Sequence, residues 1–519
     1  MKLSKSVMLG AAVCLLSTGA SAQAAGDLLA LSQYNYSFST ARSAALGGAF
    51  TSLGADLSSM SINPAGLGMY MSSDFGISPS LTWSNMKSSY LGTKSDYSRT
   101  RFTLGNLGMA FNLYQGSGTL TSFTLGVGYT KLADFNTTSA AYGQGIDKSI
   151  TDVLAEYMNG VPLSSLGHPD NDPYQPFRRA DIGLWGGILA YQTGILDPMS
   201  DAQDNTQYTV ANNLATGSRI NPSMRNVNKG SVDEYSISGG FNIQNILYLG
   251  FTIGIQDILY RNDNYYAETY DNNSLPLNGM NYIRSLHLDG TGVNFKFGAV
   301  VRPIENLRIG VAVHTPTLVS INEEYIEWMS ADYKNTARGE LLDSPRSLNE
   351  YDINTPTRLL TGISYTLPGV GLITADYERV WYNRMKLRNM GTENWEFQQT
   401  INNEVSSFYQ PANNFRVGIE ATPTQNFYIR AGYANYGECI ATRDAFNNMS
   451  SINSYENYSA GLGFRFQNMY VDLAYIYTEY KYAPYTMFYY GDPNYVINPG
   501  NVETKQSRNT ITMSVGVRF

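Results

Sequence analysis

The chain has 519 residues and a net charge of −8, with 35 Lys and Arg against 43 Asp and Glu. Because nucleic-acid binding proteins usually have an excess of basic residues, this charge does not indicate a nucleic-acid partner. After the N-terminus no segment approaches the run of about 18 apolar residues that a transmembrane helix needs. Only 15% of the residues are charged, whereas 48 are Gly and 40 are Tyr. This composition is typical of membrane strands with an apolar lipid face and aromatic rims.

The N-terminus has the three parts of a secretory signal. Residues 1–5 are basic, residues 6–16 are apolar, and Ala20-Ser21-Ala22 is a small-residue cleavage site. We predict a signal peptide over residues 1–22. Because its removal also removes Cys14, Cys439 is left alone and no intramolecular disulfide is expected.

Segments of alternating polarity recur from residue 73 to the end. In the last nine residues, 511–519, apolar and polar side chains alternate without error and the chain ends on Phe519. A strand of this kind at the end of an exported chain predicts the closing strand of an outer-membrane barrel. We predict fourteen strands, at residues 73–83, 100–113, 119–131, 231–243, 247–260, 289–302, 307–319, 355–366, 371–383, 413–422, 426–435, 456–467, 469–480 and 508–519.

The connections alternate in length. Every second one is short, as at 115–118, 244–246 and 467–468, and those between are long, above all 132–230. Tight periplasmic turns and long outer loops make this pattern in an up-and-down barrel, whereas a soluble repeat protein has no reason to alternate in this way. The predicted fold is all-β: a 14-stranded antiparallel transmembrane β-barrel over residues 73–519, in the outer membrane of a Gram-negative bacterium.

A barrel of fourteen strands needs something inside it. Its lumen is wider than that of an eight-stranded barrel, which side chains can fill, and narrower than that of a water-filled porin. Residues 23–72 precede the first strand, are rich in Gly, Ala and Ser, and have too few large apolar residues to fold by themselves. We expect them to form an N-terminal hatch inside the barrel, with polar residues of the inward strand faces as partners.

Two short motifs stand within that segment. Gly47, Gly48 and Phe50 belong to a run of small residues that ends in an aromatic one, and Asn63-Pro64-Ala65 follows. Their order between a signal peptide and fourteen strands resembles the FadL-type family of outer-membrane transporters for long-chain fatty acids and other hydrophobic compounds. An acidic pair that often stands between the two blocks is here reduced to Asp56.

The resemblance implies passive uptake of a hydrophobic small molecule by a monomeric channel in outer-membrane lipid. It also implies that the ligand is captured at outer loops, passes a pocket above the hatch and leaves sideways at a kinked third strand. In this chain the third strand has Gly126 and Gly128 on one face, where a bend costs little. An ordinary strand remains an equal reading of these glycines.

The longest loop, 132–230, contains two segments that do not look like coil. Ser149 can cap a helix with one apolar stripe that ends at Asn159-Gly160, and residues 181–191 are strongly apolar. Apolar surface on an outer loop usually marks a binding site. We expect a hydrophobic capture groove built by Leu154, Tyr157, Met158, Leu184, Trp185, Ile188 and Leu189. Alternatively, the two segments bury only each other as a lid.

An enzyme is not expected. The three His residues, His168, His287 and His314, have no accompanying motif that would supply a nucleophile or a carboxylate. No cofactor and no metal site is expected, since the mature chain has one Cys and no close His pair. Two other functions stay open: a hatch-bearing barrel of a type IX-like protein secretion system, and a general porin for polar solutes.

Overall fold

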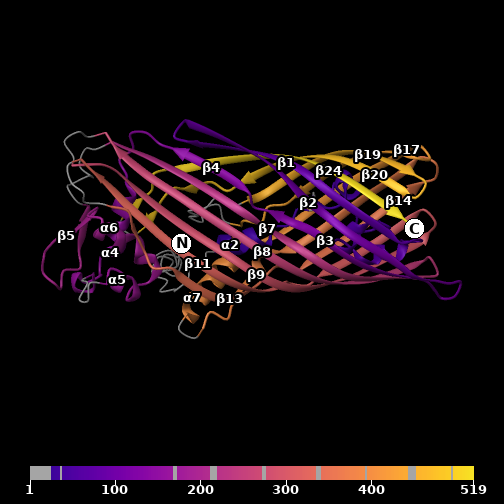
Figure 1. The fold of residues 1–519 in the computed structure, drawn as a ribbon, viewed down its shortest axis with the longest axis horizontal. Helices are drawn as coiled ribbons and strands as arrows, with labels where there is room; N and C mark the ends of the chain where they lie inside the picture. Colours follow the sequence, from indigo (N-terminus) through magenta and orange to yellow (C-terminus); the bar gives the residue numbers. More distant parts are fainter. Residues whose placement is uncertain are drawn as a thin grey trace, which may run out of the picture.

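The computed structural model describes residues 25–35, 38–166, 172–210, 219–271, 276–334, 340–391, 394–441, 452–491 and 495–519. The predicted signal peptide and His168 lie outside the described residues. An antiparallel sheet curls into a barrel and closes where β1 (Asp74–Tyr90) pairs with β24 (Asn501–Arg518) (Figure 1). Among the described residues, no helix is both long and apolar enough to cross a membrane.

The wall has fourteen strands, in the predicted order, so the predicted fold class is confirmed. Besides β1 and β24, the unbroken strands are β2 (Thr93–Gln115), β3 (Leu120–Asp134), β7 (Ile220–Ile243), β8 (Leu247–Tyr270), β9 (Leu277–Ile304), β15 (Gly371–Trp381), β17 (Pro411–Thr424), β18 (Phe427–Tyr436), β19 (Ile452–Phe466) and β20 (Met469–Tyr482).

Two strands of the wall are interrupted side by side. The seventh consists of β10 (Leu307–His314) and β11 (Leu318–Tyr333), and the eighth of β13 (Ser347–Asn354) and β14 (Arg358–Leu367). Each break contains the sequence Thr-Pro-Thr, at 315–317 and 355–357. Proline has no N–H to donate to a ladder, so regular pairing stops there. Across the break, Thr317 N donates to Thr355 Oγ1 at 2.8 Å.

Several of the long outer loops predicted from the sequence are mostly strand in the structure, so this part of the prediction is wrong. Residues 84–99 continue β1 and β2 up to a tight turn, and most of 261–288 and 320–354 also lie in strands. The ladder between β8 and β9 runs without interruption from Leu247 to Thr269. In these extensions the outward residues are largely polar, so the apolar outer face that marks a membrane strand is lost although the backbone pairing continues. Shorter strands accompany these extensions: β4 (Thr137–Tyr142), β5 (Leu196–Pro198), β6 (Tyr208–Val210), β12 (Leu342–Asp343), β16 (Lys386–Arg388), β21 (Tyr485–Thr486), β22 (Tyr490–Gly491) and β23 (Val496–Ile497).

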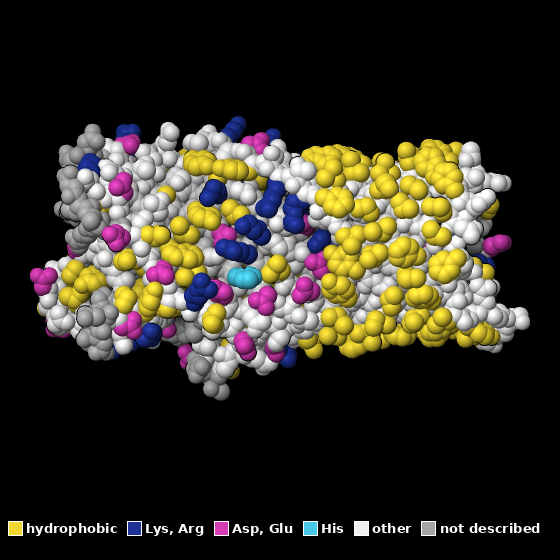
Figure 2. Space-filling view, viewed as in Figure 1, with side chains coloured by type: hydrophobic (Ala, Val, Ile, Leu, Met, Phe, Trp, Pro, Cys, Tyr) yellow, Lys and Arg dark blue, Asp and Glu magenta, His cyan; other side chains and the backbone are white. Residues whose placement is uncertain are grey.

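An apolar band covers the half of the barrel that ends in the short turns, and polar side chains prevail over the rest (Figure 2). Such a band is the lipid-facing surface of an outer-membrane barrel. Exposed large side chains of the band come from strands all round the wall, including Phe75, Leu81, Phe102, Val127, Ile237, Phe251, Phe297, Val311, Ile363, Val417, Leu462, Leu473 and Met513.

The N-terminal segment lies within the wall. It contains α2 (Ala25–Ser32), α3 (Ala41–Ala45) and the 3-10 turns η2 (Leu57–Met60) and η3 (Pro64–Met69), and almost all of its described side chains are buried. Its hydrogen bonds reach inward-facing groups on strands far apart in the wall. They join Ser61 to Thr130, Met60 to Thr252, Ile62 to His314, Thr51 to Asp376, Arg42 to Glu420, Ala45 to Ser459 and Ala41 to Ser514.

The two sequence motifs shape this segment. Gly47 and Gly48 have φ of +67° and +76°, a left-handed conformation that favours glycine. Asn63 caps η3: its Oδ1 accepts from Ala65 N at 3.1 Å, while its Nδ2 donates to the Thr51 carbonyl at 2.6 Å. Pro64 occupies the first position of η3, where its missing N–H costs nothing.

Glycines on the inner wall let the segment approach the strands. A Cβ at Gly298 of β9 would lie 1.8 Å from Asn63 Oδ1, and one at Gly250 of β8 would lie 2.2 Å from the Pro64 carbonyl carbon. A Cβ at Gly310 would lie 2.2 Å from the carbonyl oxygen of Thr51, and one at Gly432 would lie 2.2 Å from the backbone nitrogen of Gly47. Much of the unusual glycine content therefore serves contact between wall and segment.

Replacing Gly298 with Leu should displace Asn63-Pro64 and break hydrogen bonds of the Asn63 side chain, such as those with Thr51 and Ala65, at a cost of about 1–3 kcal/mol. We expect the variant to conduct ions in planar bilayers where the unaltered protein is closed. Gly118→Leu is the matched control, because nothing lies within 4 Å of that position. Equal conductance of the two variants would contradict a seal at this contact.

Candidate ligand cavity and strand divergence

A cavity of about 120 Å³ lies inside the barrel between α2 and the wall. Its lining comes from the N-terminal segment and from strands on two sides of the lumen. The lining residues are Gly26, Leu29, Ala30, Gln33, Asn35, Met86, Ala133, Asp134, Phe135, Thr137, Ser139, Asn226, Asn228, Tyr260, Asn262, Ile452, Tyr455, Tyr480, Tyr482, Gln506 and Arg508.

Aromatic rings form one side of this cavity. Tyr455 of β19 and Tyr480 of β20 face each other with ring centroids 5.2 Å apart, and Tyr436 stacks on Tyr455 at 4.0 Å. On the other side, Phe135 meets Tyr260 edge to face at 5.3 Å. The tyrosine hydroxyls are turned to the N-terminal segment: Tyr455 donates to the Tyr34 carbonyl at 2.7 Å. The cavity therefore offers ring faces to a ligand while the hydroxyls hold the segment.

Arg508 is the cation of the cavity lining. It is 6% exposed, its guanidinium lies 5.2 Å from the Tyr480 ring centre and 5.9 Å from that of Phe38, and its Nη2 donates to the Asp134 carbonyl at 3.1 Å. Its buried Nε has no acceptor, and within the described part of the chain Arg508 forms no ion pair. A buried guanidinium with unused donor capacity can take the polar end of a ligand.

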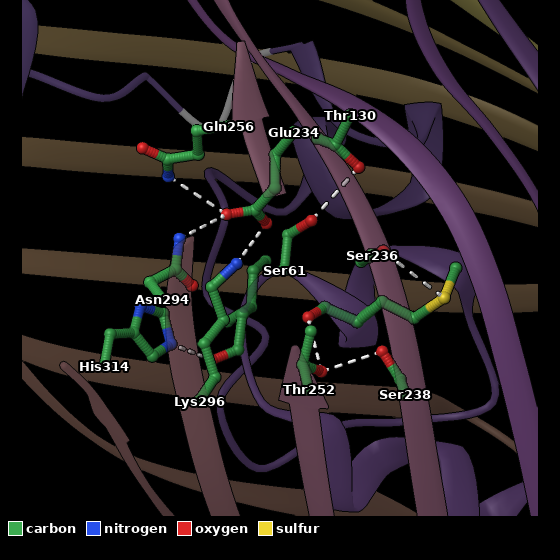
Figure 3. Close-up of polar contacts among 12 residues, drawn as sticks. Ser61, Thr130, Glu234, Ser236, Ser238, Thr252, Gln256, Asn294, Lys296 and His314 are labelled. Carbon is green, nitrogen blue, oxygen red and sulfur yellow. Dashed lines mark hydrogen bonds and ion pairs between the residues drawn. The ribbon is translucent and has the colours of Figure 1, made fainter. Parts of the chain in front are cut away.

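The polar groups beneath the cavity, in contrast, form hydrogen bonds and an ion pair with one another (Figure 3). Lys296 forms an ion pair with Glu234, which also accepts from Gln256 and Asn294 at 3.0 and 3.2 Å. His314 Nε2 contacts the Ile62 carbonyl at 2.9 Å. Buried charges that are paired and hydrogen-bonded are stable where they are, so these residues form a floor.

A second buried network joins the other strands. Arg416 is 3.1 Å from Glu378, and Arg430 contacts Glu420 at 2.5 Å and Asp472 at 2.6 Å. Arg42 of α3 reaches Glu420 at 3.4 Å and so ties the N-terminal segment to this network. His314 in the first network and Glu420 in the second thus hold the segment in the lumen.

The cavity reaches the place where β2 and β3 separate. Their ladder ends at the pair Asn106–Thr130, after which β2 continues with β1 and β3 continues with β7. The β3–β7 register shifts between Lys131 and Ala133. Beyond this point Arg101 of β2 and Asp134 of β3 are linked by side chains, at 3.5 Å. The wall is thus held there by side-chain contacts instead of a backbone ladder.

The two glycines predicted for a bend in the third strand lie elsewhere. Gly126 and Gly128 are paired on both sides of β3, and their missing side chains make room for Met60, whose Sδ and Cε would lie 2.8 and 2.6 Å from a Cβ at these positions. The irregularity of β3 begins three residues after Gly128, at Lys131. It could not be foreseen from glycine positions because bulky residues form it.

The outer end of the barrel has a helical cap. It contains α4 (Ile150–Met158), η4 (Leu163–Leu166), α5 (Gln175–Arg178), η5 (Ile182–Leu184) and α6 (Trp185–Gln192), and further round the rim η7 (Tyr382–Arg384) and α7 (Trp395–Phe408). The predicted helix cap is present: Ser149 accepts from Thr151 N at 3.0 Å, and Asn159 is the C-cap. Figure 1 places α4, α5 and α6 at the end opposite the C-terminus.

The predicted groove residues lie within this cap. Leu154, Met158, Trp185, Ile188 and Leu189 are buried, whereas Tyr157 and Leu184 are half-buried. The helices α4 and α6 pack on each other: a Cβ at Gly187 would lie 2.6 Å from Met158 Sδ. Trp185 lies edge to face on Phe177 and near Tyr325 of the wall. The two segments therefore pack on each other and also on the wall.

A buried carboxylate fastens the cap to the wall. Glu268 of β8 accepts from Ser149 Oγ at 2.6 Å, from Ile150 N at 2.8 Å, and from the hydroxyls of Tyr266 and Tyr270 at 2.6 and 3.0 Å. Burial raises the pKa of this carboxyl, and these donors oppose the rise. Because Glu268 lies at the N-terminus of α4, its charge is also favoured by the helix dipole.

Neither the family models nor the curated proteins searched contain a match to this sequence. Solved structures do match. The Pseudomonas putida toluene transporter TodX is 13% identical, with 94% of this chain and 99% of that chain covered and a TM-score of 0.52. A Pseudomonas aeruginosa FadL homologue is 12% identical, with 94% and 98% covered and a TM-score of 0.51. A deltaS2 mutant of the TodX monoaromatic hydrocarbon channel is 12% identical, with 94% and 100% covered and a TM-score of 0.54.

The double substitution Trp185→Ser and Leu189→Ser should loosen the cap, because it removes two buried apolar side chains at about 2–4 kcal/mol each. We expect weaker binding of an apolar fluorescent probe and faster proteolysis of residues 143–210. Leu348→Ser with Leu341→Ser, at two exposed positions, is the control. Unchanged probe affinity in a correctly folded barrel would remove these residues from the ligand path.

The likeness to these structures, at 12–13% identity, establishes the fold: this chain has the barrel fold found in TodX and in the FadL homologue.

Proposed function

We propose that the protein is an outer-membrane channel for passive uptake of hydrophobic small molecules, long-chain fatty acids or other apolar compounds, in a Gram-negative bacterium. The observation that carries the proposal is the cavity between the cap and the floor, which has tyrosine rings on one side and reaches the separation of β2 and β3 on the other. The channel needs no cofactor and works as a monomer.

The proposed route begins at the helical cap. The apolar side chains Leu154, Tyr157, Met158, Leu184, Trp185, Ile188 and Leu189 form the lid that a ligand must part, and the groove predicted from sequence is the open state of that lid. Beneath it the ligand rests on the tyrosine wall of the cavity. Arg508 and the lining amides take whatever polar end the ligand has, as their unused donor capacity favours.

The proposed exit is lateral. Along the barrel axis toward the periplasm, the path is blocked by the hatch, which contacts strands all round the wall. The hatch includes Gly47, Gly48, Phe50 and Asn63-Pro64-Ala65. Sideways, Ala133, Asp134 and Phe135 line the cavity at the place where β3 leaves β2. An apolar solute gains about 0.8 kcal/mol per methylene by staying out of water, so a path into lipid is favoured over one into the periplasm. The glycines Gly126 and Gly128 contribute by seating Met60 beside this exit.

The solved structures support the same function. One is described as a toluene transporter and another as a monoaromatic hydrocarbon channel, and both share the fold of this chain. A porin for polar solutes would need a wet lumen, whereas the described N-terminal segment is almost wholly buried. A carrier barrel in protein export stays a separate candidate that copurification with secreted proteins would favour.

Filling the cavity should weaken ligand binding. Ala133→Phe adds a ring at a buried lining position, so we expect about tenfold weaker binding of a fatty acid or toluene, a loss of about 1.4 kcal/mol. Ala431→Phe, on the exposed outer face of β18, is the matched control. Isothermal titration in detergent measures both.

Mass spectrometry of compounds extracted from the folded, washed protein tests the proposal directly. A hydrophobic molecule should be present in the unaltered protein and in Ala431→Phe, and reduced in Ala133→Phe. The absence of any bound or bindable apolar compound, together with steady ion conductance, would favour a porin.

A further inference from the structure

Cations gather on the outer face of the barrel just beyond the apolar band (Figure 2). Two basic residues and a histidine form a row across neighbouring strands: Lys229 of β7 is paired with Arg261 of β8, and Arg261 with His287 of β9. The side chain of Arg261 is 51% exposed, Lys229 is exposed and His287 is half-buried. We call Lys229, Arg261 and His287 the first row.

A second row lies on another set of adjacent strands. Lys87 of β1 is paired with Lys505 of β24, and Lys505 with Lys481 of β20, and all three side chains are exposed. The two rows flank β2 and β3 on either side, since β1 is the neighbour of β2 and β7 is the neighbour of β3. Each row therefore borders the separation of those strands.

Rows of this kind carry an unfavourable interaction. Residues directly opposite in an antiparallel pair have Cβ atoms about 5 Å apart, and like charges there are destabilising. Nearby carboxylates relieve part of the repulsion: Asp263 accepts from Arg261 Nε at 3.0 Å, Glu456 contacts Lys481 Nζ at 2.9 Å, and Asp96 is paired with Lys87. Within the described part of the chain, Lys229, Lys87 and Lys505 form no ion pair. An external anion would remove the remaining cost.

Both rows lie at the same height. Lys87 is six residues beyond Leu81 of the band, Lys505 six residues before Ile511, and Arg261 six residues beyond Ile255. Six residues at about 3.3 Å each, on a strand tilted about 40°, rise about 15 Å above Leu81, Ile511 and Ile255, while Arg261 lies about 5 Å above the exposed Leu259 of its own strand. That height is the headgroup layer of the outer leaflet.

The next two strands along the wall have the reverse charge. Glu324 of β11 is paired with His287 of the first row, and Glu350 and Asp352 lie on β13, which is paired with β11. Anions in the surrounding leaflet are thus attracted to the strands nearer β2 and β3 and repelled from β11 and β13.

We propose that the two rows bind phosphate groups of the anionic glycolipid in the outer leaflet and so hold a lipid molecule on each side of the β2–β3 separation. Lys and Arg are suited to this because charge-assisted hydrogen bonds to phosphate are short and strong. The proposal rests on the proposed outer-membrane location. It adds a fixed lipid ligand beside the exit, independent of the molecule that is transported.

The test uses the full mature chain in detergent, titrated with purified lipopolysaccharide and with the same material after removal of its phosphates. The first-row variant is Lys229→Gln with Arg261→Gln, and the second-row variant is Lys87→Gln with Lys505→Gln. Lys386→Gln with Arg388→Gln removes two exposed cations from β16 and is the matched control. Heat-modifiable migration on gels verifies folding, and Lys229→Arg keeps the charge.

Each row variant should bind lipopolysaccharide about tenfold more weakly than the control, as the loss of two charge-assisted contacts implies. The dephosphorylated form should bind weakly to all variants. Equal binding by row variants and control, equal binding of both lipid forms, or full displacement by inorganic phosphate at the concentration of the lipid would overturn the proposal. If the same samples still bind an apolar ligand when lipopolysaccharide binding fails, only the proposed lipid site is contradicted. If they bind lipopolysaccharide but no apolar ligand, the result counts against the proposed channel function.

Discussion

The seal between the N-terminal segment and the inner wall is the contact on which the rest of this structure depends. A lumen of fourteen strands is too wide for wall side chains to fill, so the buried backbone of the segment and the inward charges must satisfy each other. They do so through contacts such as Thr51 with Asp376 and Arg42 with Glu420. Glycines such as Gly250 and Gly298 let backbone lie against backbone, which no larger residue would permit.

This seal decides where anything inside the barrel can go. The floor uses its polar groups in the Lys296–Glu234 network, and the cap is fastened by Glu268, so the described cavity lies between two closed ends. The weak place is lateral, where β2 and β3 part: Arg101 with Asp134 is a side-chain contact, and the links further out, from Ser95 and Tyr97 of β2 to β4, also involve side chains. A side-chain contact of this length, with Arg101 partly exposed, contributes about 0–1 kcal/mol, which is far less than a ladder of backbone hydrogen bonds.

The outer surface matches this geometry. The apolar band fixes the depth of the barrel in lipid, and the cation rows stand about a headgroup layer above it, on both sides of the strand separation. The acidic residues of β11 and β13, which follow β9 along the wall, end the stretch that attracts anionic lipid.

The sequence by itself determined the strand number and the strand order, because alternation over a lipid-facing wall and short turns are local patterns. It also determined the helix that Ser149 begins. It missed the strand extensions beyond the band, where polarity no longer alternates. Only the tertiary structure decided that Tyr455, Tyr480 and Arg508 line one cavity, and that β2 separates from β3 beside it. The physical reason is that the tilt and stagger of the strands close the barrel. They bring together residues that are far apart in the sequence, and no local pattern records this proximity.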